Sequence, residues 1–129
     1  MLSFVFVKGA DCGPPASFTN TNIQAAVNLW VSNQTSATSA YGPLPMWDLR
    51  EVTSLASLLY CNDGSNGQAY VGMPSFNSDV SMWDVSKVTT MYRTFIYASA
   101  FNGDVSKWDV GRVTSMSQSK SIYVYLRMT

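Results

Sequence analysis

Two residue types recur together at positions where they could do chemistry. Each of Trp47, Trp83 and Trp108 is followed directly by an aspartate. Exposed indoles beside carboxylates would suit a module that binds or cleaves carbohydrate, and several carboxylates together could ligate a cation such as calcium. A large residue repeated at one position is more typical of a core, and a repeated aspartate often accepts hydrogen bonds from backbone N–H groups. We favour the core and capping interpretations and keep the carbohydrate module as the alternative. The aspartates are Asp48, Asp84 and Asp109.

The sequence lacks the residues that most enzymatic sites require. Its 129 residues include no histidine and a single glutamate, Glu51, and its 8 basic residues balance its 8 acidic ones. Without histidine, neither a Ser-His-Asp arrangement nor the common zinc sites can form, and no glycine-rich phosphate-binding motif is present. The balanced charge, without runs of one sign, provides no attraction for nucleic acid. We therefore expect a non-enzymatic protein without cofactor, metal or nucleic-acid partner.

Two further features bear on the compartment. Cys12 and Cys61 have no neighbouring ligand residues, which leaves either two free thiols or one long-loop disulfide. Residues 1–7 are apolar but lack a preceding basic segment, so they are either the remnant of a signal peptide or a short first strand. No apolar run approaches the ~20 residues that span a bilayer, so we expect no membrane span.

The most informative feature is an internal repeat. Residues 76–91 recur at 101–116 with an offset of 25, and eleven of the sixteen paired positions are identical. An earlier copy begins at Leu44 and is displaced from the second by 36, so we expect an insertion within 60–75, where Asn, Asp and Gly are dense. A period of this length indicates stacked units that share one core.

Each unit has two halves with different spacing of apolar residues. Those of 88–98 follow i, i+3, i+4 and i+7, which predicts a short helix. The preceding Val80-x-x-Trp83-x-Val85 is similar to the strand of leucine-rich repeats, although Val80 and Trp83 differ in parity, so the backbone must turn between them. The predicted fold is an α/β repeat, a short leucine-rich-repeat-like solenoid of about three strand-helix units. Its expected core columns are Val80, Trp83, Val85, Val88, Met91 and Phe95, with Val105, Trp108, Val110, Val113 and Met116.

The repeat also resembles that of a known family. The string F-N-x-D-V-S-x-W-D-V-x-x-V-T-x-M is similar to the repeat of the BspA-like leucine-rich-repeat surface proteins, and the resemblance covers Leu44 to Met116. It implies a solenoid on a secreted or cell-surface protein, with adhesion or protein binding in some members and no catalysis. The third unit departs from the pattern, because Lys120 replaces the counterpart of Phe95. That unit is either a cap or a truncated copy, and a repeat fragment without independent function is a further alternative.

A capping helix is expected ahead of the repeats. The apolar residues of 23–31 recur at i, i+3, i+4, i+7 and i+8, and Thr21 with Gln24 gives a capping-box signal. The first unit of a stack needs such a cover for its apolar end. We predict a helix at 20–32 and then a linker with the glycosylation sequon Asn33-Gln34-Thr35. The chain then divides into an N-terminal segment (1–19), capping helix and linker (20–39), repeat solenoid (40–116) and degenerate C-terminal cap or tail (117–129).

A binding face follows from strand geometry. If Trp83 and Val85 point inward, the alternate residues point outward, and stacked units place them side by side at about 4.8 Å. This ladder mixes apolar, acidic and basic groups, which suits a weak protein contact better than a deep small-molecule pocket. We predict a protein-binding or adhesion-type module with a protein ligand or cell-surface partner, at a cell surface or outside the cell. The candidate binding residues are Met46, Asp48, Arg50, Met82, Asp84, Ser86, Lys107 and Asp109.

Overall fold

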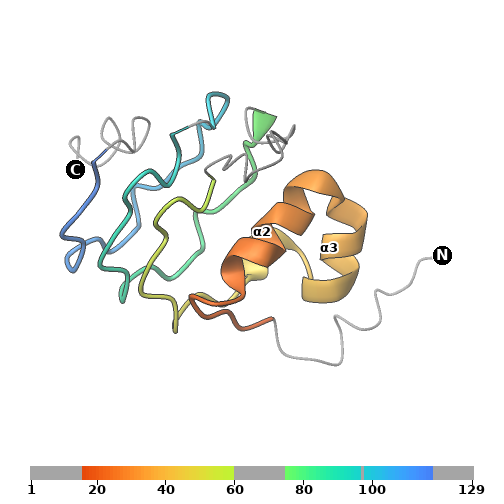
Figure 1. Cartoon of the computed structure of the whole chain (residues 1–129), viewed down its shortest axis with the longest axis horizontal. Coiled ribbons are helices and arrows are strands. Elements are labelled where there is room, and N and C mark those ends of the chain that lie inside the picture. The colour runs from red at the N-terminus through yellow and green to blue at the C-terminus, as the bar shows by residue number, and fades with distance from the viewer. Residues whose placement is uncertain (1–15, 60–74, 97, 118–129) are drawn as a thin grey trace, which may run out of the picture.

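The computed structural model describes residues 16–59, 75–96 and 98–117 (Figure 1). In chain order, the elements are α2 (Ile23–Ser32), α3 (Gln34–Tyr41) and the 3-10 turn η1 (Leu44–Met46). The repeats follow as unit one (44–59), unit two (76–96) and unit three (101–117). The two helices lie at one end of the molecule beside unit one, and units two and three follow toward the other end (Figure 1).

Helix α2 is the predicted amphipathic cap. Its residues Ile23, Ala26, Val27 and Trp30 are buried, as the helical spacing predicted. The capping box is wrong, because the N-cap residue is Asn22 and the Gln24 side chain instead donates to the backbone oxygen of Leu58, at 2.9 Å. Gln24 therefore ties the helix to unit one.

Helix α3 occupies the stretch that was expected to be a linker. The side chain of Asn33 accepts a hydrogen bond from the backbone N–H of Ser36 at 3.0 Å and caps the helix. The helix buries only Ala37 and ends at Tyr41. Gly42 follows, and its φ of 78° lies in the left-handed region that glycine tolerates best. The sequon asparagine is thus an exposed capping residue at the junction of two helices.

Units two and three contain neither helix nor strand among their described residues, so the predicted α/β repeat, a leucine-rich-repeat-like solenoid of strand-helix units, is wrong. The predicted helix is replaced by turns, with Arg93 at φ 60°, a conformation that a right-handed helix cannot contain. Ser57, its counterpart in unit one, has φ 59°. The predicted strand is broken by two turns. The Trp83 N–H donates to the Val80 oxygen at 3.1 Å, and the Val88 N–H donates to the Val85 oxygen at 2.9 Å.

Backbone hydrogen bonds between units replace the expected sheet. Thr89 donates its N–H to the Thr53 oxygen, and Thr114 donates in the same way to Thr89, both at 2.8 Å. Their hydroxyl groups donate to the same two oxygens at 3.2 Å. In the described residues the only strand-like pairings are isolated parallel bridges, such as Ser54 with Thr90 and Thr90 with Ser115. Successive units therefore lie side by side in register without forming regular strands (Figure 1).

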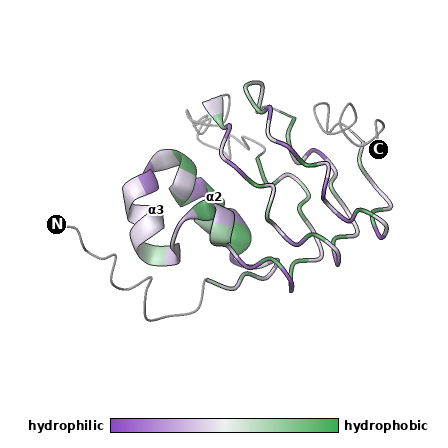
Figure 2. Ribbon diagram, turned by 180° about the vertical axis from the view of Figure 1, so that it is seen from behind, coloured by the Kyte–Doolittle hydropathy of each residue, from purple (hydrophilic) through white to green (hydrophobic). Residues whose placement is uncertain are grey.

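The core runs continuously from α2 to unit three. Hydrophobic and hydrophilic stretches alternate along each unit in Figure 2, and the hydrophobic ones meet inside. The predicted columns are confirmed: eight of their residues are buried, and Val110, Val113 and Met116 of unit three are partly buried against the same core. The buried column residues are Val80, Trp83, Val85, Val88, Met91, Phe95, Val105 and Trp108.

Several predictions concern residues outside the described ranges. They include the first strand or signal remnant at 1–7, the pair Cys12 and Cys61, and Lys120 with the C-terminal tail. The insertion also lies there, apart from its last residue, Ser75. Within the described part of the chain, no helix has the length and apolar character needed to cross a bilayer.

Candidate functional site

The predicted binding residues lie on the surface in the expected alternation. Met46 and Met82 are 59% and 72% exposed and are the exposed large hydrophobic residues of the described segments. They occupy equivalent positions in units one and two, and in each unit a buried tryptophan follows. The outward-facing residues that come next in the two units are partly or fully exposed: Asp48, Arg50, Asp84 and Ser86.

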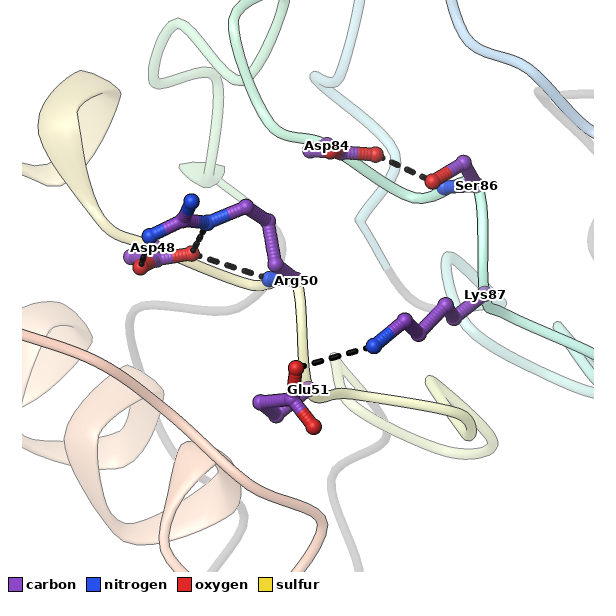
Figure 3. Close-up of polar contacts among 6 residues, drawn as sticks. All are labelled: Asp48, Arg50, Glu51, Asp84, Ser86 and Lys87. Carbon is purple, nitrogen blue, oxygen red and sulfur yellow. Dashed lines mark hydrogen bonds and ion pairs between the residues drawn. The ribbon is translucent and has the colours of Figure 1, made fainter.

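A shallow, open hollow of about 320 Å³ lies on this surface between units one and two. It brings together four of the predicted residues and three that were not predicted, Ser17, Glu51 and Lys87. Figure 3 shows these residues apart from Ser17. Lys107 and Asp109, the candidates in unit three, are exposed but do not line it. The hollow's predicted residues are Asp48, Arg50, Asp84 and Ser86.

The sequence indicates two of the three additional residues but not the third. Glu51 and Lys87 have opposite charges at equivalent repeat positions, a signal that the sequence contains. Their side chains form an ion pair between units one and two at 2.9 Å (Figure 3). Ser17 lines the hollow because it forms an isolated parallel β-bridge with Asp48 of unit one. No repeat pattern covers Ser17, so nothing in the sequence indicated its place.

Asp48 and Arg50 form a two-pronged ion pair at one side of the hollow. Arg50 Nε donates to Asp48 Oδ1 at 2.9 Å, and Nη2 donates to Oδ2 at 2.6 Å. The backbone N–H of Arg50 also donates to Oδ1, at 3.0 Å. The side-chain hydrogen bonds of Arg50, followed by this backbone bond, lower the pKa of Asp48 to about 2. Asp48 is therefore ionised at neutral pH and is fixed in orientation.

The other aspartates of this surface close small turns, as the capping interpretation predicted. Asp84 Oδ1 accepts a hydrogen bond from the Ser86 N–H at 3.0 Å, and Asp109 binds the Gly111 N–H in the same way. Hydrogen bonding by Ser86, from its side chain and then its backbone, lowers the pKa of Asp84. Asp84 is therefore a carboxylate at neutral pH and cannot serve as a general acid there.

The buried indoles argue against the carbohydrate alternative. Trp47, Trp83 and Trp108 are 3%, 4% and 5% exposed, which leaves no ring face on which a sugar could stack. The described ranges also hold no cluster of three or more His, Cys, Asp or Glu that could bind a metal ion. What remains on this surface are two exposed methionines at equivalent positions of units one and two, and an open hollow lined by charged and hydroxyl side chains.

Comparison with known proteins places the chain in a family. Residues 30–121, which include α3 and all three units, match the family described as Mycoplasma protein of unknown function, DUF285. No curated protein and no solved structure matches the chain.

Proposed function

The chain belongs to this DUF285 family, and on that premise we propose that it is a non-enzymatic, adhesion-type module that binds protein at a cell surface or outside the cell. The proposal includes kinship with the BspA-like surface proteins, which the repeat string supports. The partner is a protein that meets the surface formed by Met46, Met82 and the hollow. We call this surface the methionine face.

The exposure of the methionine pair is the observation that carries the proposal. Exposed apolar side chains that lie next to one another commonly mark interaction sites. The residues that follow the two methionines, Trp47 and Trp83, stack with ring centroids 6.3 Å apart, which brings Met46 and Met82 to neighbouring positions of the two units. Met46 and Met82 each lie two residues before an aspartate that lines the hollow, so apolar and polar groups adjoin on one face. Methionine is flexible and polarizable, which suits it to contact with varied protein surfaces.

The charged side chains around the hollow are arranged to give such a face a defined shape. Arg50 is held by Asp48, and Lys87 is held by Glu51 across the boundary between units (Figure 3). Side chains that are already paired lose less conformational freedom when a partner binds. The hollow is shallow and polar, which fits a protein side chain better than an enclosed small molecule.

Selection of random peptides displayed on phage, with the full chain immobilised, tests the proposal. We expect clones whose affinity falls at least about tenfold in a Met46→Ser/Met82→Ser variant, because each buried methionine contributes roughly 1.5–3 kcal/mol to a contact. The matched control is Met46→Leu/Met82→Leu, which keeps the apolar area and should retain binding. Failure to select any clone, or equal binding to the serine variant, would reject the methionine face as the binding site.

A further inference from the structure

The methionine face is bordered by carboxylates that have no ion-pair partner among the described residues. Met82 lies three residues after Asp79 and two before Asp84, so the chain holds both acids within about 10 Å of it. The ion pairs in the described segments are Arg50 with Asp48 and Lys87 with Glu51. These pairs neutralise the other charges around the hollow. Asp79 and Asp84 are therefore outside these pairs, although Arg50 acts on Asp84 at longer range and the exposed Lys107 of unit three acts on Asp104.

Neighbouring units add further acids beside these two. Asn77 Oδ1 accepts a hydrogen bond from the Asn102 N–H at 2.8 Å, which aligns the units and sets Asp104 beside Asp79. Hydrogen bonding by Ser81 lowers the pKa of Asp79, although desolvation and then the negative charge of Asp104 oppose this effect. The charge on this side of Met82 is therefore fully developed at neutral pH.

We propose that the methionine face binds a protein segment that carries basic side chains next to apolar ones. The apolar side chains pack on Met46 and Met82, and the basic ones meet Asp84 and Asp79. This inference rests on the proposed function and adds the chemistry of the partner. Lysine and arginine fit both requirements in part, because their apolar stems can lie on the methionines while their charged ends reach the carboxylates.

Charge complementarity selects this partner over others. Asp79, Asp84 and Asp104 outnumber Lys107, so an acidic protein segment or an anionic lipid surface would meet net charge of the same sign. A purely apolar segment would leave these carboxylates partly desolvated and unpaired, at a cost in free energy. A segment with both kinds of side chain satisfies the apolar and the charged parts of the face together.

Short fluorescein-labelled peptides provide the test. Three are compared on the full chain by fluorescence anisotropy: one alternates lysine and leucine, one glutamate and leucine, and one lysine and serine. We expect the lysine–leucine peptide to bind at least tenfold more tightly than either of the others. Its affinity should fall as salt is raised, because exposed charges are screened.

Matched variants of the chain locate the charge effect. Asp84→Asn keeps the Oδ1 atom that accepts the Ser86 N–H, so the turn is retained and one charge is removed. It should weaken the lysine–leucine peptide about three- to fivefold, as expected for an exposed charge pair. Ser39→Lys on α3 changes the net charge of the chain by the same amount at a residue that does not line the hollow, and it should have less than a twofold effect.

Three results would overturn the inference. One is equal affinity for the lysine–leucine and glutamate–leucine peptides, and another is equal weakening by Asp84→Asn and Ser39→Lys. The third is a set of phage clones that need Met46 and Met82 but are unaffected by Asp84→Asn, which would keep the proposed function and reject the basic partner. Circular dichroism of each variant confirms that the fold is retained.

Discussion

Trp83 joins units one and two through both its ring and its nitrogen. Its ring stacks on that of Trp47, with centroids 6.3 Å apart and planes inclined by 7°. Its Nε1 donates to the Leu44 oxygen at 2.9 Å in a buried position. The repeat predicted that this column is buried. It did not predict the acceptor, because an acceptor 39 residues earlier is fixed only by how the units stack.

Replacing Trp83 with phenylalanine isolates the contribution of this hydrogen bond. We expect Trp83→Phe to lower the free energy of unfolding by about 2 kcal/mol, roughly half from the lost hydrogen bond and half from the smaller ring. Trp30→Phe is the control, because Trp30 Nε1 donates to a partly buried Ser78 hydroxyl that water can replace. It should lose about half as much. Urea unfolding measures both, and equal losses would contradict the importance of the buried acceptor.

At the scale of elements, the sequence predicted α2 well and missed α3. Helix α2 has a full apolar stripe, which is the signal that periodicity detects. Helix α3 has the sequence QTSATSAY and buries one alanine, so periodicity has almost nothing to detect. Its start depends instead on Asn33, whose hydrogen bond is a local interaction.

The helix expected in unit two failed for a different reason. Its apolar residues follow a helical spacing, but a series of tight turns can bury residues at the same spacing. The N–H groups of Met91 and Arg93 donate to Ser115 and Ser117 at 2.7 and 3.1 Å. These donors are thus used between units, where they complete the stack. Whether these N–H groups bond within a helix or between units depends on the neighbouring unit, which a local sequence pattern does not contain.

The cap of α3 can be tested by substitution at Asn33. We expect Asn33→Ala to destabilise the protein by about 1 kcal/mol, because the Ser36 N–H loses its acceptor, whereas Asn33→Asp should retain most of the stability. Thr35→Ala is the control, since it also removes the glycosylation sequon but leaves the cap in place. Thermal unfolding followed by circular dichroism compares the three. A loss with Thr35→Ala as large as that with Asn33→Ala would argue against capping.

At the scale of the whole molecule, the candidate site depends on the stack. The outward alternation near Trp83 and Val85 predicted Asp48, Arg50 and Asp84 as surface neighbours, and the hollow unites them. The bridge between Ser17 and Asp48 could not be predicted, because it joins a segment outside the repeats to unit one. A repeat therefore predicts which residues share a face, whereas the segments that border that face require the structure.

The Asp48–Arg50 pair makes the stability of the molecule depend on pH. The pKa of Asp48 in the folded protein, about 2, is below the ordinary value of 3.8 for an aspartate. A lowered folded-state pKa gives stabilisation that is present above about pH 4 and is lost as the pH falls through 2. Asp48→Asn, which keeps the Oδ1 acceptor, should thus be less stable than the native chain at pH 7, and the difference should shrink toward zero near pH 2.

Denaturant unfolding at pH 7, 4 and 2 measures this dependence. The comparison variant is Asp84→Asn, because Asp84 has a lowered pKa but does not form the bidentate ion pair with arginine that Asp48 forms. Its difference from the native chain should change less between pH 4 and pH 2. A pH-independent difference for Asp48→Asn would show that the ion pair is not the source.

The indole hydrogen bonds of the repeated tryptophan column, Trp47, Trp83 and Trp108, all run in one direction along the chain. Trp47 donates to Gly42, Trp83 to Leu44 and Trp108 to Val80, so each acceptor precedes its donor. A polypeptide that emerges from the ribosome amino end first thus exposes each acceptor of this column before the ring that needs it has been synthesised. Each later ring of the column can therefore dock on an acceptor that already exists, whereas backbone donors such as the N–H groups of Leu55 and Met91 find their acceptors only when the next unit arrives.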